Sequence, residues 1–211
     1  HFSFLERFVE TPFNRMSLGS NFPMLDIQYA LGLKDVFKGQ YNYHRIKASV
    51  QQKIRLGIYG TSKYKVEAGK IWGTLPYPLL ELHNGNETYF FYDDSYNLMN
   101  YYEFISDQYV SGRLEHHFEG FFFNKVPLFR KLMLREVITG KAVYGSLSSQ
   151  HNSVLLLPEI SHTLTEPYIE VAAGIENILT VLRIDAIWRI SHLDNPGAVP
   201  FGVRAKLQVG F

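Results

Sequence analysis

Alternation of side-chain character with a period of two residues is the feature that most constrains this chain. It is clearest over residues 43–56, where charged and polar residues alternate with mostly apolar ones. A β-strand sorts such a pattern onto its two faces, whereas a helix would mix the two sets. The polar set is Arg45, Lys47, Ser49, Gln51, Lys53 and Arg55, and the opposite set is Ile46, Ala48, Val50, Gln52, Ile54 and Leu56.

The same alternation recurs along the chain and predicts an all-β, antiparallel fold. Strands are predicted at 23–33, 43–56, 63–69, 108–118, 168–176, 182–191 and 201–211. Segment 131–145 is also strand-like, although its two faces are ambiguous, and residues 1–13 are either a further strand or a loop. We therefore expect seven or eight strands that follow one another as hairpins.

The connections between these strands alternate in length, with long ones at 73–104 and 146–166 and tight turns near 57–60 and 177–180. Long external loops and short periplasmic turns are typical of outer-membrane barrels, and this order places the C-terminus on the periplasmic side. No apolar run approaches the roughly 20 residues of a membrane helix, so a spanning form must be a closed sheet. The pattern predicts an antiparallel transmembrane β-barrel in a Gram-negative outer membrane.

A soluble antiparallel sandwich is the alternative, because it also alternates polar and apolar residues. Two features favour the barrel. Charges recur on the polar face of nearly every predicted strand, as a hydrated lumen requires. The strands are also long, at about 10 to 14 residues, compared with roughly 5 or 6 in soluble proteins.

The composition narrows the possible functions. A net charge of +1 gives no reason to expect nucleic acid as a partner, and the absence of cysteine excludes disulfides and thiolate metal sites. The sequence holds no nucleophile elbow, phosphate-binding loop or dinucleotide fingerprint. We therefore expect no enzymatic activity and no cofactor.

Charged residues on the polar faces are the candidate site, since they would point into the lumen. Such charges either set ion preference in a pore or link neighbouring strands across a filled lumen, and the second role is slightly favoured because opposite charges recur on neighbouring strands. The first group, largely basic, is Arg45, Lys47, Lys53, Arg55, Lys63, Lys65 and Glu67; the second, of mixed sign, is Arg113, Glu115, Glu170, Glu176, Arg183, Asp185, Arg189, Arg204 and Lys206.

Two clusters suggest metal binding, and neither is favoured. His116 and His117 are neighbours on a predicted strand, so they would point to opposite faces and could not hold one ion together. Asp93 and Asp94, with Glu87, form an acidic patch on a long loop without the spacing of a known calcium motif. A solvated loop is the better interpretation, and no metal is expected.

The long segment 73–104 is rich in aromatic and aliphatic residues and contains no lysine or arginine from 74 to 103. So much apolar area predicts an ordered segment that folds over or into the lumen. Its acids would complement the basic strands at 43–56 and 63–69. An external hairpin that packs on neighbouring loops is almost equally favoured. The acids are Glu81, Glu87, Asp93, Asp94 and Glu103.

The last strand ends in a pattern that resembles the C-terminal signal of outer-membrane proteins, carried by Gly202, Leu207, Val209 and Phe211. The stretches NRMSLGSNFPMLDIQYALGLK (14–34) and PYIEVAAGIENI (167–178), together with residues 69–137, resemble a family of uncharacterised outer-membrane barrels. Members of that family typically carry a carboxypeptidase-regulatory-like domain before the barrel. The resemblance implies that this chain is the C-terminal part of a larger barrel.

A more distant resemblance is to the BamA-like surface-antigen barrels of about 16 strands, in which a late loop follows a Gly-x-x-Pro segment. Gly73 and Pro76 fit that frame. The arginine that this loop carries in those proteins has no counterpart here, which weakens any transfer of their activity.

Three functions follow from these observations. The first is transport or assembly without covalent chemistry, the second is a structural or docking barrel, and the third and least favoured is a barrel enzyme. The expected partners are outer-membrane lipid, the outer-membrane assembly machinery during biogenesis, and other outer-membrane or periplasmic proteins.

Overall fold

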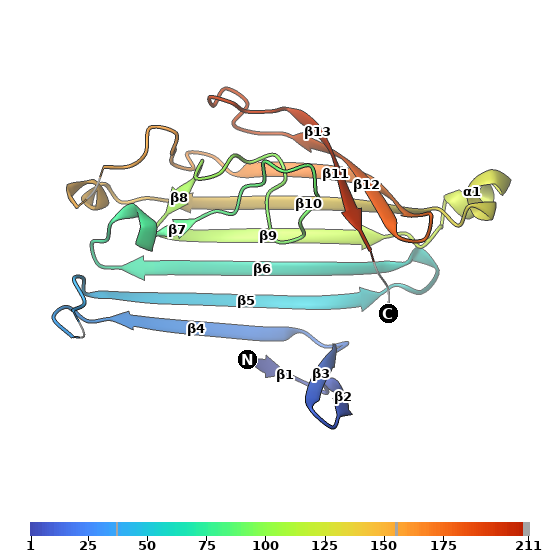
Figure 1. Cartoon of the computed structure of the whole chain (residues 1–211), viewed down its shortest axis with the longest axis horizontal. Coiled ribbons are helices and arrows are strands. Elements are labelled where there is room, and N and C mark those ends of the chain that lie inside the picture. Colours follow the sequence, from blue (N-terminus) through green and yellow to red (C-terminus); the bar gives the residue numbers. More distant parts are fainter. Residues whose placement is uncertain (37, 155, 209–211) are drawn as a thin grey trace.

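The computed structural model describes residues 1–36, 38–154 and 156–208 and is dominated by one antiparallel sheet (Figure 1). Nine strands lie in the order β1-β4-β5-β6-β9-β10-β11-β12-β13. The predicted all-β fold is confirmed, and so are the consecutive hairpins, since the eight longer strands follow chain order. These strands are β4 (Met24–Gly32), β5 (Tyr43–Arg55), β6 (Thr61–Trp72), β9 (Gln108–His117), β10 (Arg135–Ser146), β11 (Tyr168–Ile178), β12 (Leu182–Arg189) and β13 (Phe201–Leu207).

The shorter strands lie at the margins of this sheet. Segment 1–13, left open between strand and loop, contains β1 (Phe2–Ser3), which pairs with the start of β4, and β2 (Arg7–Thr11). A separate hairpin joins β2 to β3 (Asn14–Gly19), and a second small ladder joins β7 (Glu81–Leu82) to β8 (Ile105–Ser106).

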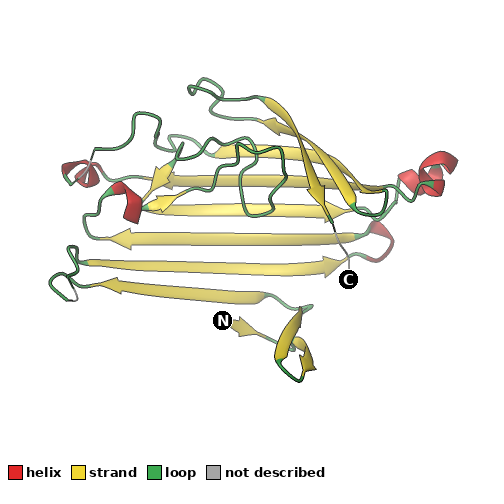
Figure 2. Ribbon diagram, viewed as in Figure 1, coloured by secondary structure: helices red, strands yellow, loops and turns green. Residues whose placement is uncertain are grey.

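Helices are confined to the connections (Figure 2). No helix in the described part of the chain is long and apolar enough to cross a membrane. The helices are η1 (Gly57–Tyr59), η2 (Tyr77–Leu79), η3 (Phe123–Lys125), α1 (Pro127–Lys131) and η4 (Ser149–Ser153).

Two strand boundaries differ from the prediction for identifiable reasons. Strand β6 is longer than the predicted 63–69, because its ladder with β5 continues to the pair of His44 and Trp72. Strand β10 begins at Arg135, not at residue 131, because Pro127 occupies the first turn of α1. Proline has a fixed φ and no N–H group, so it suits a helix start and cannot donate to a ladder.

The register of the sheet places the alternating charges on one face. Residues directly opposite in a ladder point to the same side. Lys65 is opposite Arg113, Arg113 is opposite Lys141, and Lys141 is opposite Glu170. Glu170 is in turn opposite Arg189. We call this continuous surface the inner face.

The other side of the sheet, the outer face, is apolar and exposed. Its side chains remain accessible along every long strand: Ile27 is 53% exposed, Val66 47%, Val110 47%, Ile138 45% and Val203 50%. Between them, the two faces reproduce the alternation read from the sequence.

Segment 73–104 lies against the inner face, and the protein's core forms between the two (Figure 1). Three buried clusters make up this core. In each of them, side chains of the segment pack on side chains of the sheet or its connections. The first contains Tyr96, Met99, Phe104, Tyr109, Val143, Leu164 and Tyr168; the second Ile71, Leu75, Leu80 and Ile105; the third Phe91, Leu98, Ala172 and Ile187.

The two ends of the sheet are built differently. Connections 56–60, 118–134 and 179–181 meet at one end, here called the turn end, since Thr61 and Val137 both pair with His117 there. The opposite end carries the connections 33–42, 73–104, 147–167 and 190–200 and is called the loop end. Over the described residues the sheet stays open, with β13 at one edge and β4, paired to β1 at only two positions, at the other.

Candidate functional site

The inner face and the segment that covers it bring most of the predicted charged residues together. Within the segment, the backbone at Gly85 passes close to the backbone of residues 99 and 100. A Cβ atom at Gly85 would lie 2.3 Å from the carbonyl oxygen of Asn100 and 2.6 Å from that of Met99. Only glycine therefore permits the close approach of the two backbone stretches.

The acids of the segment pair with cations of the sheet. Glu81 binds both Arg45 and Lys47, with 2.9 Å between its carboxylate and the Lys47 ammonium group. Asp94 lies 2.6 Å from the Arg113 guanidinium and 4.0 Å from Lys65. The contacts with β5 and β6 agree with the prediction, whereas the contact of Asp94 with Arg113 of β9 was not predicted.

Two other acids of the segment reach further across the sheet than predicted. Asp93 binds Lys206 of β13 at 2.6 Å, and Glu103 binds Arg189 of β12 at 2.6 Å. Glu87 instead accepts a hydrogen bond from the backbone N–H of Tyr101 within the segment. The segment therefore spans the inner face from β5 to β13.

The pair of Glu103 and Arg189 is the most enclosed of these contacts. Both side chains are essentially buried, and the guanidinium donates to both carboxylate oxygens, at 2.6 and 3.0 Å. Burial alone would raise the pKa of Glu103, but hydrogen bonds from Arg189 and Asn195 hold it below its ordinary value. Glu103 is therefore ionised at neutral pH.

Backbone groups of the segment are also held by side chains of the sheet. Glu170 accepts hydrogen bonds from the N–H groups of Asn97 at 2.9 Å and Leu98 at 3.1 Å. Lys141 of β10 donates to the carbonyl oxygens of Tyr92 and Ser95. Lys141 was not predicted as a site residue, because the faces of segment 131–145 are ambiguous in the sequence. Its register opposite Glu170 is what places it on the inner face.

A second charged cluster lies on the inner face near the turn end. Arg183 is fully buried and donates to Asp185 at 2.8 Å and to Glu115 at 2.6 Å. His117 bridges Glu115 at 2.7 Å and Glu176 at 3.0 Å. These contacts cross-link β9, β11 and β12, and the Arg183 guanidinium also lies 4.7 Å from the ring centre of Phe91 in segment 73–104.

The adjacent histidines point to opposite faces, as predicted. His117 belongs to the inner cluster, whereas His116 contacts Ser62 at 2.7 Å and stacks edge-on against Phe118. Within the described part of the chain, no group of three or more histidine, aspartate or glutamate side chains is arranged to hold a metal ion.

The remaining predicted site residues lie at the margins of these networks or outside them. Lys53 and Arg55 are exposed near the turn end and form no ion pair with any described residue. Lys63 lies 3.4 Å from Glu115, and among the described residues Arg204 donates only to the carbonyl oxygen of Val203. Lys65 and Glu67 are neighbours on β6, 3.5 Å apart.

A polar cavity remains beside the segment, lined by residues of β5, β6, β9 and the segment itself. His83 lies at its margin, and burial lowers the pKa of this imidazole to about 4. The neutral ring contacts the Ser106 hydroxyl at 2.9 Å. Ser106 has no exposed surface, so this pair offers no accessible nucleophile. A neighbouring cavity shares Lys65, Asp94 and Arg113 in its lining.

The segment also satisfies part of the free edge of β13. The N–H group of Phe91 donates to the carbonyl oxygen of Ala205 at 2.8 Å, and the N–H group of Ala205 donates to Tyr89 at 3.0 Å. Of the predicted C-terminal signal, Gly202 and Leu207 lie in β13, while Val209 and Phe211 fall outside the described residues.

A comparison with protein families identifies the family to which these residues belong. Residues 1–155 match the C-terminal domain of a family of unknown function, DUF5686. This chain belongs to that family. The matched part of the DUF5686 domain contains β1 to β10, including segment 73–104 and its partners Arg45, Lys47 and Arg113. A comparison with curated proteins found no match.

Proposed function

We propose that this chain is the embedded sheet of a Gram-negative outer-membrane β-barrel, with a transport or assembly role and no covalent chemistry. The outer face would contact lipid. The inner face would surround a lumen that segment 73–104 largely fills. The observation that carries the proposal is the contrast between an exposed apolar face and an opposite face with buried, paired charges.

Burial of charge on only one side of a long antiparallel sheet supports this arrangement. A soluble sandwich would bury its apolar face and expose its charged one. Here the apolar side chains are exposed, while Lys141, Glu170 and Arg183 are buried. Lipid is the environment in which exposed valine and isoleucine rows are stable.

Aromatic residues on the outer face add a second line of support. Trp72, Tyr144, Trp188 and Phe201 are all exposed near the loop end, at 41–49%. The indole ring of Trp188 lies 5.4 Å from the ring of Phe201. Belts of aromatic residues mark the membrane–water interface in barrels.

Membrane embedding is tested by lipid quenching of tryptophan fluorescence. The chain holds two tryptophans, so Trp72→Phe leaves Trp188 as the sole reporter. We expect vesicles of brominated lipid to quench Trp188 in the refolded protein, and water-soluble iodide to quench it little. Strong iodide quenching without bromolipid quenching would refute the membrane proposal.

Transport is tested separately by single-channel conductance in planar bilayers. We expect low conductance for the parent protein and higher conductance for a variant that lacks residues 77–99. Bromolipid quenching of Trp188 serves as the control that the deletion variant still embeds. Unchanged conductance in an embedded deletion variant would refute a lumen plug.

The docking alternative is favoured by one specific observation, the six ion pairs between described residues that join segment 73–104 to β5, β6, β9, β12 and β13. A segment held at so many positions would keep the lumen closed. If neither the parent nor the deletion variant conducts, a structural or docking barrel becomes the better proposal.

A further inference from the structure

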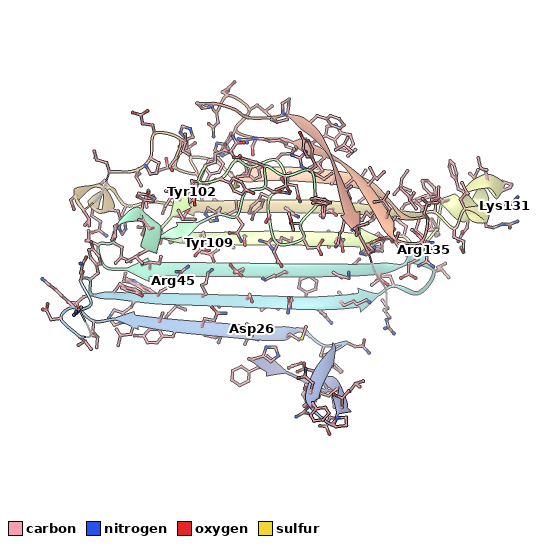
Figure 3. The ribbon with its side chains drawn as sticks, in the orientation of Figure 1. Asp26, Arg45, Tyr102, Tyr109, Lys131 and Arg135 are labelled. Carbon is pink, nitrogen blue, oxygen red and sulfur yellow. The ribbon has the colours of Figure 1, made fainter. Side chains whose placement is uncertain are left out.

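The turn end of the sheet carries a basic and apolar surface that the proposed lumen function does not use. It consists of residues 57–59, 121–135 and 177–181, which we call the turn-end surface. Segment 121–135 projects beyond the ends of the strands (Figure 1). Lys131 and Arg135 lie at this end of the molecule, and Arg45 and Tyr102 lie toward the opposite end (Figure 3).

Contacts between the three connections make this a single surface. The ring of Tyr59 in η1 lies 5.5 Å from the ring of Phe121. Asn177 donates a hydrogen bond of 2.7 Å to the carbonyl oxygen of Met133. Phe121 and Phe122 stack edge-on at 4.9 Å.

The acids that flank segment 121–135 are occupied within the protein. Glu136 accepts hydrogen bonds from the N–H groups of Gly120, Phe122 and Phe123, which fixes the start of the aromatic run. Glu119 accepts a hydrogen bond of 2.6 Å from the Thr61 hydroxyl. Among the described residues, neither carboxylate forms an ion pair with a cation of the segment.

Four cations of the segment are exposed, and none forms an ion pair with a carboxylate of the described residues: Lys125, Arg130, Lys131 and Arg135. No aspartate or glutamate occurs in 57–59, 121–135 or 177–181. Lys125 lies over the rings of Phe121 and Phe122, at 4.8 and 5.8 Å. The turn-end surface is therefore uniformly positive.

Large apolar side chains lie among these cations. Leu128 is 61% exposed and Leu132 53%, and Leu179 of the adjoining turn is 84% exposed. Exposed leucines and aromatics interleaved with lysine and arginine are the combination that binds the boundary between lipid headgroups and acyl chains. Basic residues at that depth attract anionic lipids.

We propose that the turn-end surface binds the phosphate groups of anionic phospholipids in the leaflet that surrounds this end of the sheet. The leucines and phenylalanines enter the upper acyl region, and Lys125, Arg130 and Lys131 meet the headgroups. Arg135 is opposite Glu176 in the ladder and therefore lies on the inner-face side of this end. This proposal rests on the proposed membrane location and adds a lipid class and a side of the membrane to it. The turn-end surface is also continuous with the apolar outer face of the sheet, so a membrane around the outer face would bring lipid headgroups to the turn-end surface.

Spin-labelled lipids measure this preference in the refolded full chain. The protein is placed in neutral phosphatidylcholine bilayers that contain traces of spin-labelled phosphatidylglycerol or phosphatidylcholine. We expect the anionic lipid to associate several-fold more strongly. Each basic residue near an anionic surface contributes roughly fivefold in affinity at low salt.

A matched pair of variants locates the effect. Arg130→Gln with Lys131→Gln should remove most of the preference, and so should high salt. Lys34→Gln with Lys38→Gln removes two exposed cations from the loop end and should leave the preference unchanged. Equal association of the two lipids with the parent protein, or equal loss in both variants, would overturn the proposal.

Bromolipid quenching of Trp188 is measured in the same samples, so that the two proposals fail in different ways. Quenching without lipid preference overturns the headgroup site alone. Absence of quenching overturns the membrane location and the headgroup site together.

Discussion

Replacement of Glu103 by glutamine tests whether buried charge holds segment 73–104 against the sheet. Glu103 is 2% exposed and its partner Arg189 3%. The carboxylate accepts two hydrogen bonds from the guanidinium and one each from Asn195 and the N–H group of Asn100. Glutamine keeps the shape of the side chain and removes its charge.

The expected effect on docking of the segment is large. Removal of one partner of a buried ion pair costs about 3–5 kcal/mol, because the remaining charge is left uncompensated. Glutamine retains one acceptor oxygen for Arg189, so we expect a cost near the lower limit, about 3 kcal/mol. The open population of the segment should then rise roughly a hundredfold.

Limited proteolysis with chymotrypsin measures the open population of segment 73–104. Tyr89 is 84% exposed, but cleavage at the buried Phe91 or Phe104 requires the segment to open. When opening and closing are fast compared with cleavage, the cleavage rate follows the open population. We expect Glu103→Gln to accelerate cleavage at the buried sites about a hundredfold.

Two controls make the test specific. Glu159→Gln removes an exposed acid of the 147–167 connection and should leave cleavage unchanged. Glu103→Leu combined with Arg189→Met replaces the pair by apolar side chains and should restore much of the protection. Parent-like cleavage of Glu103→Gln, or a double variant as labile as the sum of the single ones, would show that the pair does not hold the segment.

Three further predictions follow from single positions. Val171→Arg puts a charge on the outer face of β11 and should cost about 2–4 kcal/mol in guanidinium unfolding from bilayers; unchanged stability would show that this face does not meet lipid. Burial lowers the pKa of His83 from 6.5 to about 4, so as the pH falls from 6.5 to 4 His83 is protonated in the open state before it is in the docked state, and the docked state loses stability. His83→Gln should make proteolysis less dependent on pH between these values. A pH profile like that of the parent protein would contradict this role of His83. Gly85→Ala should increase cleavage through its clash with the Asn100 carbonyl, whereas Gly112→Ala, with open space around it, should not; equal cleavage of the two variants would show that the close backbone approach at Gly85 does not hold the segment.

Strand identity was predictable wherever one face of the strand is lined by charges. In β5 and β12 most polar residues lie on one face and most apolar residues on the other, so the alternation of polar and apolar residues predicts both faces. Arg183, Ile184 and Asp185 are an example. In β10 the inner face mixes the buried Val143 with Lys141, because segment 73–104 packs its own apolar side chains against Val143. Apolar residues then occur on both faces, and the pattern loses its contrast.

The sequence predicted which charged residues belong to the candidate site, but not which of them form ion pairs with each other. The acids of segment 73–104 stand out in the sequence because the segment contains no basic residue. Which cation each acid meets depends on how far the segment extends across the sheet. Asp93 reaches Lys206, and Glu103 reaches Arg189, because the sheet curls and brings β12 and β13 over the inner face (Figure 1). Local sequence contains no information on that curvature.

The contacts of segment 73–104 also imply an order of events during folding. Glu103 and Arg189 are 86 residues apart in the chain, and Asp93 and Lys206 are 113 apart. Contacts between such distant residues form late, because closing the long intervening loop costs conformational entropy before the contact itself contributes any stability. Glu103 and Asp93 can form these pairs only after β12 and β13 have joined the sheet, so the folding chain passes through a stage in which part of the charged inner face is still uncovered.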